Sequence, residues 1–353
     1  MPQFPAPRAR ARSQGATPVR RWCAGLAAAA CIAFSAVAAT AAPATVAPSR
    51  LQELQTVADG VLLLPGRFER GRQPDGNSLL LLGREGWVLI DSGRHAEHAE
   101  ALRQAMRASG RPLRAVINTH WHLDHLGGNA LLRDTETGWR SHASAALQDA
   151  VNQRMPQSEA DLKRMLQDPA TDDTTRRMVE VDLALYARRS LLLPDELLDG
   201  PPREVQIAGR ALRVGVELGV SGGDVWVLDQ ASGVLAVGDF VTLPVPFLDT
   251  ACTTQWRASL QRLLALPFSR VLPGHGPLLD REGFKRYGQA LDRLLTCAAG
   301  EGAVTECAAG WIADLGPLLP AASQRSVSPM LAHYFGQRLR VPPAERERFC
   351  SPR

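Results

Sequence analysis

The stretch HWHLDH, residues 120–125, decides what this chain can be. It holds three of the chain's eight histidines and one carboxylate within six residues, and it follows the apolar run AVI at 115–117. That run predicts a buried strand that ends just before the histidines. Residues two apart on an extended chain point the same way, so His120 and His122 can bind one ion together.

The side chains in this stretch select among the metals that proteins bind. Imidazole and carboxylate suit zinc first, then iron or manganese. Asp124 and His125 lie just past the first pair of histidines and turn toward a second metal position. A chance cluster of surface histidines is the plain alternative. Eight histidines in 353 residues make that alternative unfavourable, so the sequence predicts a metal site.

Three other predicted strands end in residues of the same chemical kind. The apolar runs at 87–90 and 234–237 lead into Asp91 and Asp239, and a later Gly/Pro-framed loop carries His275 after a short strand. Each signal is weak alone, because strands often end in Asp-Gly turns. Four strand ends in this order, each with an Asp or a His, together predict one site.

In these motifs the chain resembles the metallo-β-lactamase fold superfamily. The resemblance covers residues 51–295 and rests on Asp91, the H-x-H-x-D-H block, Gly238-Asp239 and the Pro-Gly-His-Gly loop around His275. It implies an α+β fold, a four-layer αββα sandwich of the metallo-β-lactamase fold. A helical insertion and a helical C-terminal extension at 296–353, packed on the core, are expected to distinguish this chain.

The resemblance also implies ligands for two metal positions. The implied ligands are His120, His122, Asp124, His125, Asp239 and His275. The first two histidines of the block serve the first position, where the family has a third histidine. The aspartate and last histidine of the block serve the second position with the late loop histidine, and Asp239 bridges both. Asp124 and Asp239 are the implied catalytic residues, and Asp91 is implied to orient a ligand histidine.

One ligand of the family pattern is missing. The third histidine of the family lies in a Gly-His-Thr-x-Gly-Asp/Ser turn, whereas residues 219–224 read GVSGGD with Val220 at the histidine position. Valine cannot bind a metal, so the first position is one ligand short unless Ser221, Asp224 or water completes it. We expect one well-held zinc at the second position and a weaker or empty first position. Three ligands plus water still make a catalytic zinc site.

The implied function is a zinc-dependent hydrolase in which a metal-activated water attacks an acyl carbon or a phosphorus centre. A small-molecule lactam, lactone, thioester, ester or phosphoester fits this chemistry. The alternative is a non-catalytic or attenuated metal-binding accessory protein, which Val220 favours. Two further classes are minor alternatives. Relatives that reduce oxygen at a di-iron centre carry glutamate in place of His122, and relatives that oxidise persulfides use the first position that Val220 impairs.

Residues 1–41 have the composition of a secretory signal peptide. Five arginines without an acidic residue precede a small-residue apolar stretch at 22–37 and an Ala-Thr-Ala cleavage site at 39–41. We therefore expect a periplasmic protein with no membrane attachment after cleavage. Losing these five arginines takes the formal net charge from +4 to −1. The basic balance therefore belongs to the signal, and we expect no nucleic-acid partner.

The cysteines divide in the same way. Four of the six follow the predicted cleavage site, namely Cys252, Cys297, Cys307 and Cys350. An even number in an exported chain indicates disulfides, and three pairings are possible. Cys297 and Cys307 bracket a glycine-containing turn, so we favour this pair together with Cys252–Cys350. The alternative interpretation makes Cys252 a thiolate ligand of the metal site.

Hydrophobic spacing predicts the remaining elements. Helices are expected at 97–108 and 253–264, three polar-rich helices between 142 and 189 form the insertion, and the chain is mostly helical after 281. The apolar loop at 243–249 either lines the substrate pocket or belongs to the core. We expect His95 and His98 on the surface or in helices, and His142 at the start of a surface helix.

Overall fold

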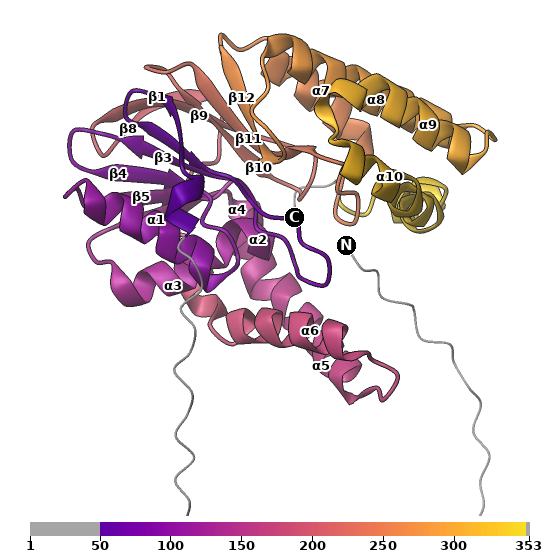
Figure 1. The fold of residues 1–353 in the computed structure, drawn as a ribbon, viewed down its shortest axis with the longest axis horizontal. Coiled ribbons are helices and arrows are strands. Elements are labelled where there is room, and N and C mark those ends of the chain that lie inside the picture. Colours follow the sequence, from indigo (N-terminus) through magenta and orange to yellow (C-terminus); the bar gives the residue numbers. More distant parts are fainter. Residues whose placement is uncertain (1–49, 351–353) are drawn as a thin grey trace, which may run out of the picture. The chain divides into compact units, whose positions relative to one another are not determined.

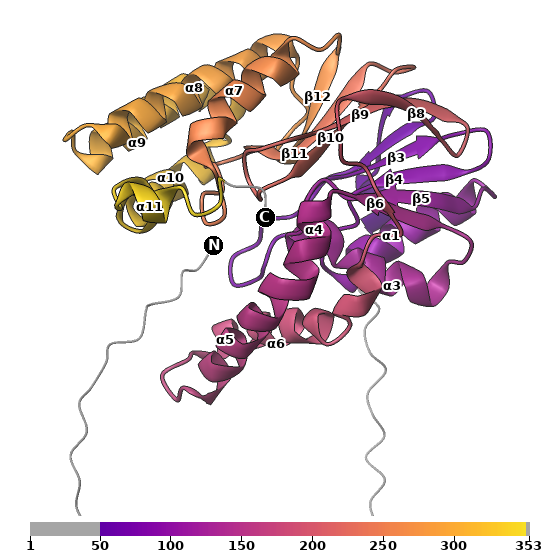
Figure 2. The same cartoon turned by 180° about the vertical axis from the view of Figure 1, so that it is seen from behind.

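A computed structural model describes residues 50–350, and the expected signal peptide at 1–41 lies outside the described residues. The described chain forms two β-sheets packed face to face, with helices on both outer sides (Figures 1 and 2). This is the expected αββα sandwich with a helical insertion and a helical C-terminal extension. None of the helices between residues 50 and 350 has both the length and the hydropathy of a membrane span.

The first sheet has seven strands in the order β1 to β7. They are β1 (Gln55–Ala58), β2 (Val61–Leu64), β3 (Ser78–Leu82), β4 (Trp87–Ile90), β5 (Leu113–Ile117), β6 (Arg140–Ala143) and β7 (Glu196–Leu197). Strands β3 and β4 form an antiparallel hairpin, whereas β4, β5, β6 and β7 run parallel. Because parallel strands end at the same edge of a sheet, β4 and β5 deliver their following residues to one place.

The second sheet has five strands in the order β12-β11-β10-β9-β8. They are β8 (Arg203–Ile207), β9 (Arg210–Glu217), β10 (Asp224–Asp229), β11 (Val234–Thr242) and β12 (Arg270–His275). Strands β11 and β12 are parallel, and their register shifts around Gly238, which has a positive φ of 54°. Strand β11 therefore runs past the expected end at residue 237, and Asp239 lies just after this irregularity.

Most helices belong to one of two outer layers. The helices are α1 (Ala96–Ala108), α2 (Leu123–Leu126), α3 (Gly128–Thr135), α4 (Ala145–Asp149), α5 (Met155–Gln167), α6 (Asp173–Tyr186), α7 (Thr253–Leu264), α8 (Arg281–Ala299), α9 (Val304–Leu315), α10 (Ala321–Tyr334) and α11 (Pro343–Arg346). The described chain also has short 3₁₀ or π segments, namely η1 (Arg50–Glu53), η2 (Ala150–Arg154), η3 (Arg189–Leu192), η4 (Gly316–Leu318) and η5 (Phe335–Leu339).

Three apolar layers hold the sandwich together. Side chains such as Leu79 and Val225 fill the space between the two sheets. Helix α1 packs on the outer face of the first sheet, where Leu102 lies in one buried cluster with Leu80. On the outer face of the second sheet a larger cluster unites β11 with α7, α8, α9 and α10. The C-terminal extension thus shares this core, and the expected boundary between residues 295 and 296 falls inside α8.

The insertion differs in one respect from the sequence prediction. His142 does not begin a surface helix but lies buried in strand β6, between β5 and β7, and pairs with Ile117 and Glu196 in the ladder. The sequence around it is short and polar, so periodicity alone could not distinguish a strand from a helix start. Helices begin only after it, and α5 and α6 pack against each other as a helical pair (Figure 1).

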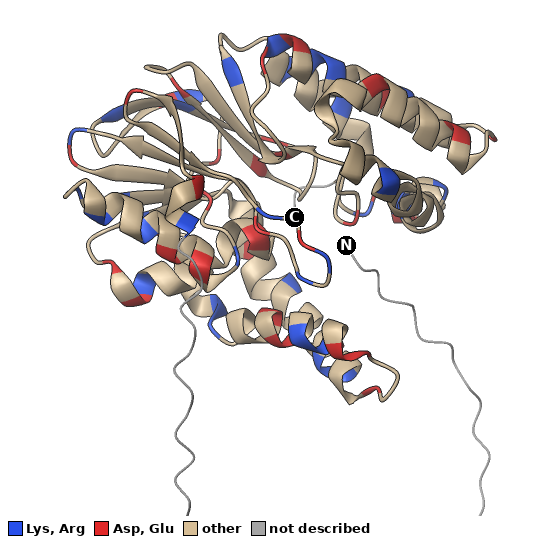
Figure 3. Ribbon diagram, in the orientation of Figure 1, with Lys and Arg blue, Asp and Glu red and all other residues tan. Residues whose placement is uncertain are grey.

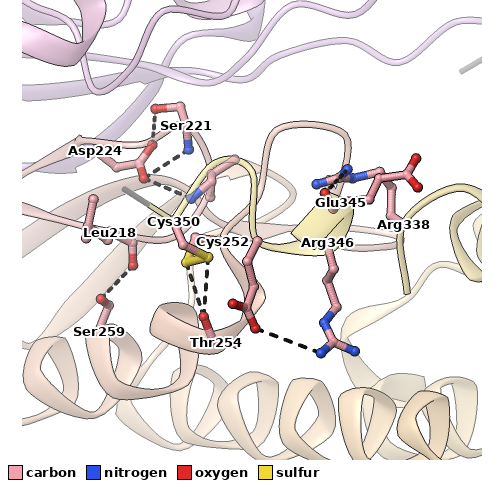
Figure 4. The surroundings of a disulfide bond; sticks show 12 residues. Leu218, Ser221, Asp224, Cys252, Thr254, Ser259, Arg338, Glu345, Arg346 and Cys350 are labelled. Carbon is pink, nitrogen blue, oxygen red and sulfur yellow. Dashed lines mark hydrogen bonds and ion pairs between the residues drawn. A yellow bond between two sulfur atoms is a disulfide. The ribbon is translucent and has the colours of Figure 1, made fainter. Parts of the chain in front are cut away.

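Both expected disulfides are present. Cys297 pairs with Cys307, and Cys252 pairs with Cys350. The second bridge fastens the C-terminus to the end of the loop 243–252, which joins β11 to α7, and this excludes Cys252 as a metal ligand. Figure 4 shows the bridge beside the turn that carries Ser221 and Asp224. The extension binds the same loop twice more, because Trp311 donates to the carbonyl of Pro244 (2.8 Å) and Arg338 to that of Leu248 (2.9 Å).

Candidate metal centre

The four strand ends that the sequence singled out meet at one buried place. Asp91 follows β4, the HWHLDH stretch follows β5, Asp239 lies in β11 and His275 ends β12. The structure brings all six predicted ligand residues into this cluster. Ligand atoms of His120, His125 and Asp239 lie within 4.8 Å of one another, and so do those of Asp124, His125 and His275.

The second position is the more completely built. His275 Nε2 lies 3.0 Å from Asp124 Oδ2 and 3.4 Å from His125 Nε2. Asp239 Oδ1 is 3.3 Å from His125 Nε2 and 3.6 Å from His275 Nε2. Two imidazole nitrogens and two carboxylates therefore converge on one point, which is a donor set that suits zinc.

Asp91 orients His125 from behind. Its Oδ2 accepts a hydrogen bond from His125 Nδ1 at 2.7 Å, which leaves Nε2 directed at the centre. Asp91 has a φ of 57°, in the left-handed region that a non-glycine residue seldom adopts, and Thr119 holds it there through its backbone N–H (2.8 Å) and its hydroxyl (2.7 Å). Such a carboxylate behind a ligand histidine fixes the tautomer and the ring orientation.

The first position is defined by the hydrogen bonds of His120. The Thr119 hydroxyl donates its proton to Asp91, so it accepts the proton of His120 Nδ1 at 2.9 Å. His120 Nε2 is therefore an unprotonated nitrogen in the neutral ring, and it lies 3.7 Å from Asp239 Oδ2.

His122 has a matching arrangement. The Thr250 hydroxyl donates to the carbonyl of Val220 at 2.7 Å, so it accepts the proton of His122 Nε2 at 2.9 Å. Nδ1 of His122 is left without a proton, 2.8 Å from Nε2 of His120. Two nitrogen lone pairs this close repel each other unless a cation or a proton lies between them. Both histidines are thus arranged to share a cation or a proton.

The carboxylates of the cluster favour positive charge between them. Burial alone would raise the pKa values of Asp124 and Asp239, but His125 and His275 outweigh it, holding the pKa of Asp124 well below its ordinary value and that of Asp239 at about 2. Burial lowers the pKa of His120 strongly and that of His122 to about 3. The pKa of His125 is instead raised well above its ordinary value, because three carboxylates around it outweigh its burial.

A metal ion fits these residues. Oδ1 of Asp239 is buried and has no hydrogen-bond partner among the described residues, which suits an oxygen that ligates a metal. Two glycines make the close approach possible. A Cβ on Gly274 would lie 2.0 Å from Asp239 Oδ1, and one on Gly76 would lie 2.3 Å from Cε1 of His125. Any larger residue at either place would displace a ligand.

The turn at 219–224 is built without a ligand. Val220 is fully buried in the apolar cluster of the second sheet. The Asp224 carboxylate accepts hydrogen bonds from the backbone N–H groups of Val220 (2.8 Å) and Ser221 (3.2 Å) and from the Ser221 hydroxyl (2.5 Å). Burial raises the pKa of Asp224 to about 6. Ser221 and Asp224 therefore hydrogen-bond to each other inside the turn. Neither residue belongs to the two groups of side chains that could hold a metal ion.

Two supporting residues were missed by sequence reasoning. Arg94 is buried between Asp182, with which it makes an ion pair, and Asp124, 3.6 Å from Oδ1. It lies three residues after Asp91 at the same strand end, which is a signal that could have been used. Thr250 belongs to a loop far along the chain, and nothing in its local sequence marks it.

His98 lies in helix α1, as one of the two expectations allowed, but neither His95 nor His98 is on the surface. His98 is fully buried, with Arg50 Nη1 and Ser78 Oγ each 2.7 Å from its ring nitrogens, and His95 Nδ1 lies 3.1 Å from Asp75 Oδ2. Their partners are distant in sequence, so spacing could not reveal them. These buried histidines adjoin the metal centre. Gly76, the residue after Asp75, donates its N–H to the carbonyl of Asp124 at 2.8 Å.

Comparisons with known proteins agree with this geometry. A family model described as the metallo-beta-lactamase superfamily matches residues 71–275. The lactamase-like protein adaB of Aspergillus niger is 36% identical over 81 residues, which is 22% of this chain and 26% of that protein. The chain therefore matches about a quarter of the length of that relative.

Two longer matches point the same way. The beta-lactamase-like protein 2 homolog of Caenorhabditis elegans is 21% identical over 241 residues, covering 66% of this chain and 67% of that protein. The solved structure of a metallo-beta-lactamase from Pontibacter korlensis has a TM-score of 0.50 and 22% identity, covering 68% of this chain and 98% of that one. This structural likeness shows the fold.

Proposed function

This chain belongs to the metallo-beta-lactamase superfamily, and from that premise we propose that it is a periplasmic zinc-dependent hydrolase of a small acyl or phosphoryl compound. The observation that carries the proposal is the convergence of Asp124, His125, His275 and Asp239 on one buried point. Zinc bound there would supply a water of lowered pKa and a Lewis acid for the electrophilic oxygen of the substrate.

The residues of the chain have distinct roles in this proposal. His125, His275, Asp124 and Asp239 would hold zinc at the second position, and His120, His122 and Asp239 at the first. Arg94 and the ligand histidines keep Asp124 ionised, so its Oδ1 or Oδ2 can accept a proton from an attacking water. Phe247, whose ring centre lies 4.7 Å from that of His122, helps to exclude bulk water.

The periplasmic part of the proposal has separate support. The basic and apolar composition of residues 1–41 resembles an export signal. The two disulfides indicate folding in an oxidising compartment.

The second candidate is a metal-binding accessory protein without turnover, and the buried Val220 favours it. Metal-dependent turnover separates the two. Purified protein should hydrolyse at least one member of a panel of neutral esters, lactones, thioesters, lactams and phosphoesters. Chelation should abolish the activity and zinc should restore it.

Asp239→Asn tests the proposed site, and Asp161→Asn is its control. Asp161 is an exposed aspartate on α5, so the control makes the same chemical change away from the site. Asp239→Asn should lose at least about 100-fold in kcat/KM while Asp161→Asn retains it. Zinc-loaded protein that turns over none of the panel would instead support the accessory function.

A further inference from the structure

An apolar cleft leads from the metal centre toward the C-terminal extension. Its walls include Phe68, Leu243, Phe247, Met330 and Tyr334. Asp239 and His275 line the same cleft. The loop 243–252 and the extension therefore form the walls of a narrow apolar cleft that starts at the proposed ligands.

The wall is continuous from a ligand histidine to the extension. The ring centre of Phe247 lies 4.7 Å from that of His122 and 6.5 Å from that of Tyr334. The Tyr334 hydroxyl bonds to Asp249 and to the backbone of Leu248, so the ring presents carbon atoms to the cleft. Phe68, in the same lining, is 52% exposed, which leaves apolar surface that a ligand could cover.

The cleft carries no complementary charge for an anion. Among the described residues that line it, none is a lysine or an arginine. The loop between β2 and β3, which carries Phe68, holds both signs of charge (Figure 3), but Arg67 pairs with Glu53 and Glu69, and Arg72 pairs with Glu97. Arg70 lies in the same loop but does not line the cleft.

From these observations we propose that the cleft is an acyl-binding subsite for the apolar, uncharged chain of a carboxylic ester, thioester or lactone. The inference rests on the proposed hydrolase function and narrows its substrate class, because phosphoesters and carboxylate-bearing lactams are anionic. Water attacks the acyl carbon beside Asp239 and His275, the bond to the alcohol or thiol breaks, and that group leaves with a proton. The acyl chain extends past Phe247 toward Met330 and Tyr334.

A matched pair of substrates tests the inference. The probes are p-nitrophenyl acetate, p-nitrophenyl hexanoate and the half ester p-nitrophenyl hydrogen adipate, which has the hexanoate chain ending in a carboxylate. Burial of a methylene favours binding by a factor of about three to four, so kcat/KM for the hexanoate should exceed that for the acetate by at least about tenfold. The adipate half ester should fall below the hexanoate by a similar factor.

Two substitutions locate the effect in the cleft. Met330→Lys places a charge on the wall and should lower the hexanoate-to-adipate ratio by about tenfold. Phe68→Ala should lower the hexanoate-to-acetate ratio, and it changes a loop residue that is half exposed, which keeps the fold intact. Val181→Lys, on the exposed side of α6, is the control and should leave every ratio unchanged.

The outcomes separate this inference from the proposed function. If the acetate is hydrolysed with zinc but the adipate half ester equals or exceeds the hexanoate, the subsite is wrong and the hydrolase stands. A preference for the adipate that disappears in Arg70→Ala would overturn the subsite in the same way. If no ester is turned over, saturation-transfer NMR of 2-octanone decides. A saturation-transfer signal in the wild type that is lost in Met330→Lys supports an apolar subsite. No signal in the wild type overturns the subsite.

Discussion

The hydroxyl oxygen of Thr250 lies 2.9 Å from Nε2 of His122 and donates its own proton to the carbonyl of Val220, 2.7 Å away. One side chain thus connects a predicted ligand of the first metal position with the residue that replaces the missing family histidine. Thr250 directs Nδ1 of His122 toward His120 without itself facing the metal. This arrangement leads to the first prediction.

Thr250→Val should weaken metal binding at the first position about 10- to 100-fold, the usual effect of losing a hydrogen bond behind a ligand histidine. The second position should keep its zinc, because Thr250 touches none of its ligands. Zinc per chain by native mass spectrometry and the visible spectrum of the cobalt-substituted protein measure this. Thr250→Ser should restore wild-type behaviour, and unchanged cobalt spectra in Thr250→Val would refute the role.

The second prediction ranks the ligands. His275→Ala and Asp124→Ala should lose most bound zinc, whereas His120→Ala should lose less, since the second position has four ligands and the first has three. Elemental analysis of purified variants measures this, with Asp161→Ala as the exposed control. Equal loss in all three variants would show that the two positions fill together.

Val220→His tests the same ranking in the opposite direction. Returning an imidazole to the turn should raise the zinc content toward two ions per chain. The larger polar ring at a fully buried apolar position should lower stability by about 1–3 kcal/mol without metal. Two tightly bound zinc ions in the wild type would contradict our view of the first position.

The disulfides should differ in their contribution to stability. Cys252–Cys350 closes a separation of 98 residues and Cys297–Cys307 one of 10. Chain entropy predicts about 5 kcal/mol for the longer loop and about 3 kcal/mol for the shorter one. Urea unfolding of Cys350→Ser and Cys297→Ser, which change two half-buried cysteines, compares them. Free thiols in the denatured, unreduced wild type, or a larger loss in Cys297→Ser, would contradict this.

A pH prediction follows from His98. Burial lowers its pKa to about 4, against the opposing pull of Asp75, and the Arg50 guanidinium adds to the effect. The unfolded chain takes up the proton near pH 6.5 and the folded chain only near pH 4. The contribution of neutral His98 to the free energy of unfolding is therefore complete above pH 6.5, and it is lost as the pH falls toward 4. The loss is on the order of 3 kcal/mol.

Replacing His98 by glutamine removes this proton-binding difference. Glutamine can still accept from Arg50 and donate toward Ser78, so the variant should have a flatter acid limb between pH 6.5 and 4. The free energy of unfolding from urea titrations at several pH values measures it. Parallel curves for His98→Gln and the wild type would assign the acid sensitivity to other groups.

Much of this protein could be predicted from local patterns. The hairpin of β3 and β4 and helices α1 and α7 follow the hydrophobic spacing of their sequences. The disulfide pairs also follow from few candidates, since four cysteines allow only three pairings. His142 was misplaced, and the burial of His95 and His98 was not predicted, because these positions depend on partners far along the chain.

The sequence by itself determined the chemistry of the centre. Three histidines and an aspartate in HWHLDH, with Asp239 and His275 at other strand ends, supply nitrogen and oxygen donors in chain order, and Asp91 supplies the carboxylate behind His125. Tertiary structure alone decided which nitrogen of each ring faces the centre, because that choice depends on Thr119, Asp91 and Thr250 from separate segments. It alone also decided that the extension would place Met330 and Tyr334 beside the site. Such contacts join residues whose separation along the chain carries no periodic signal, so only the packing of two sheets and their helices brings them together.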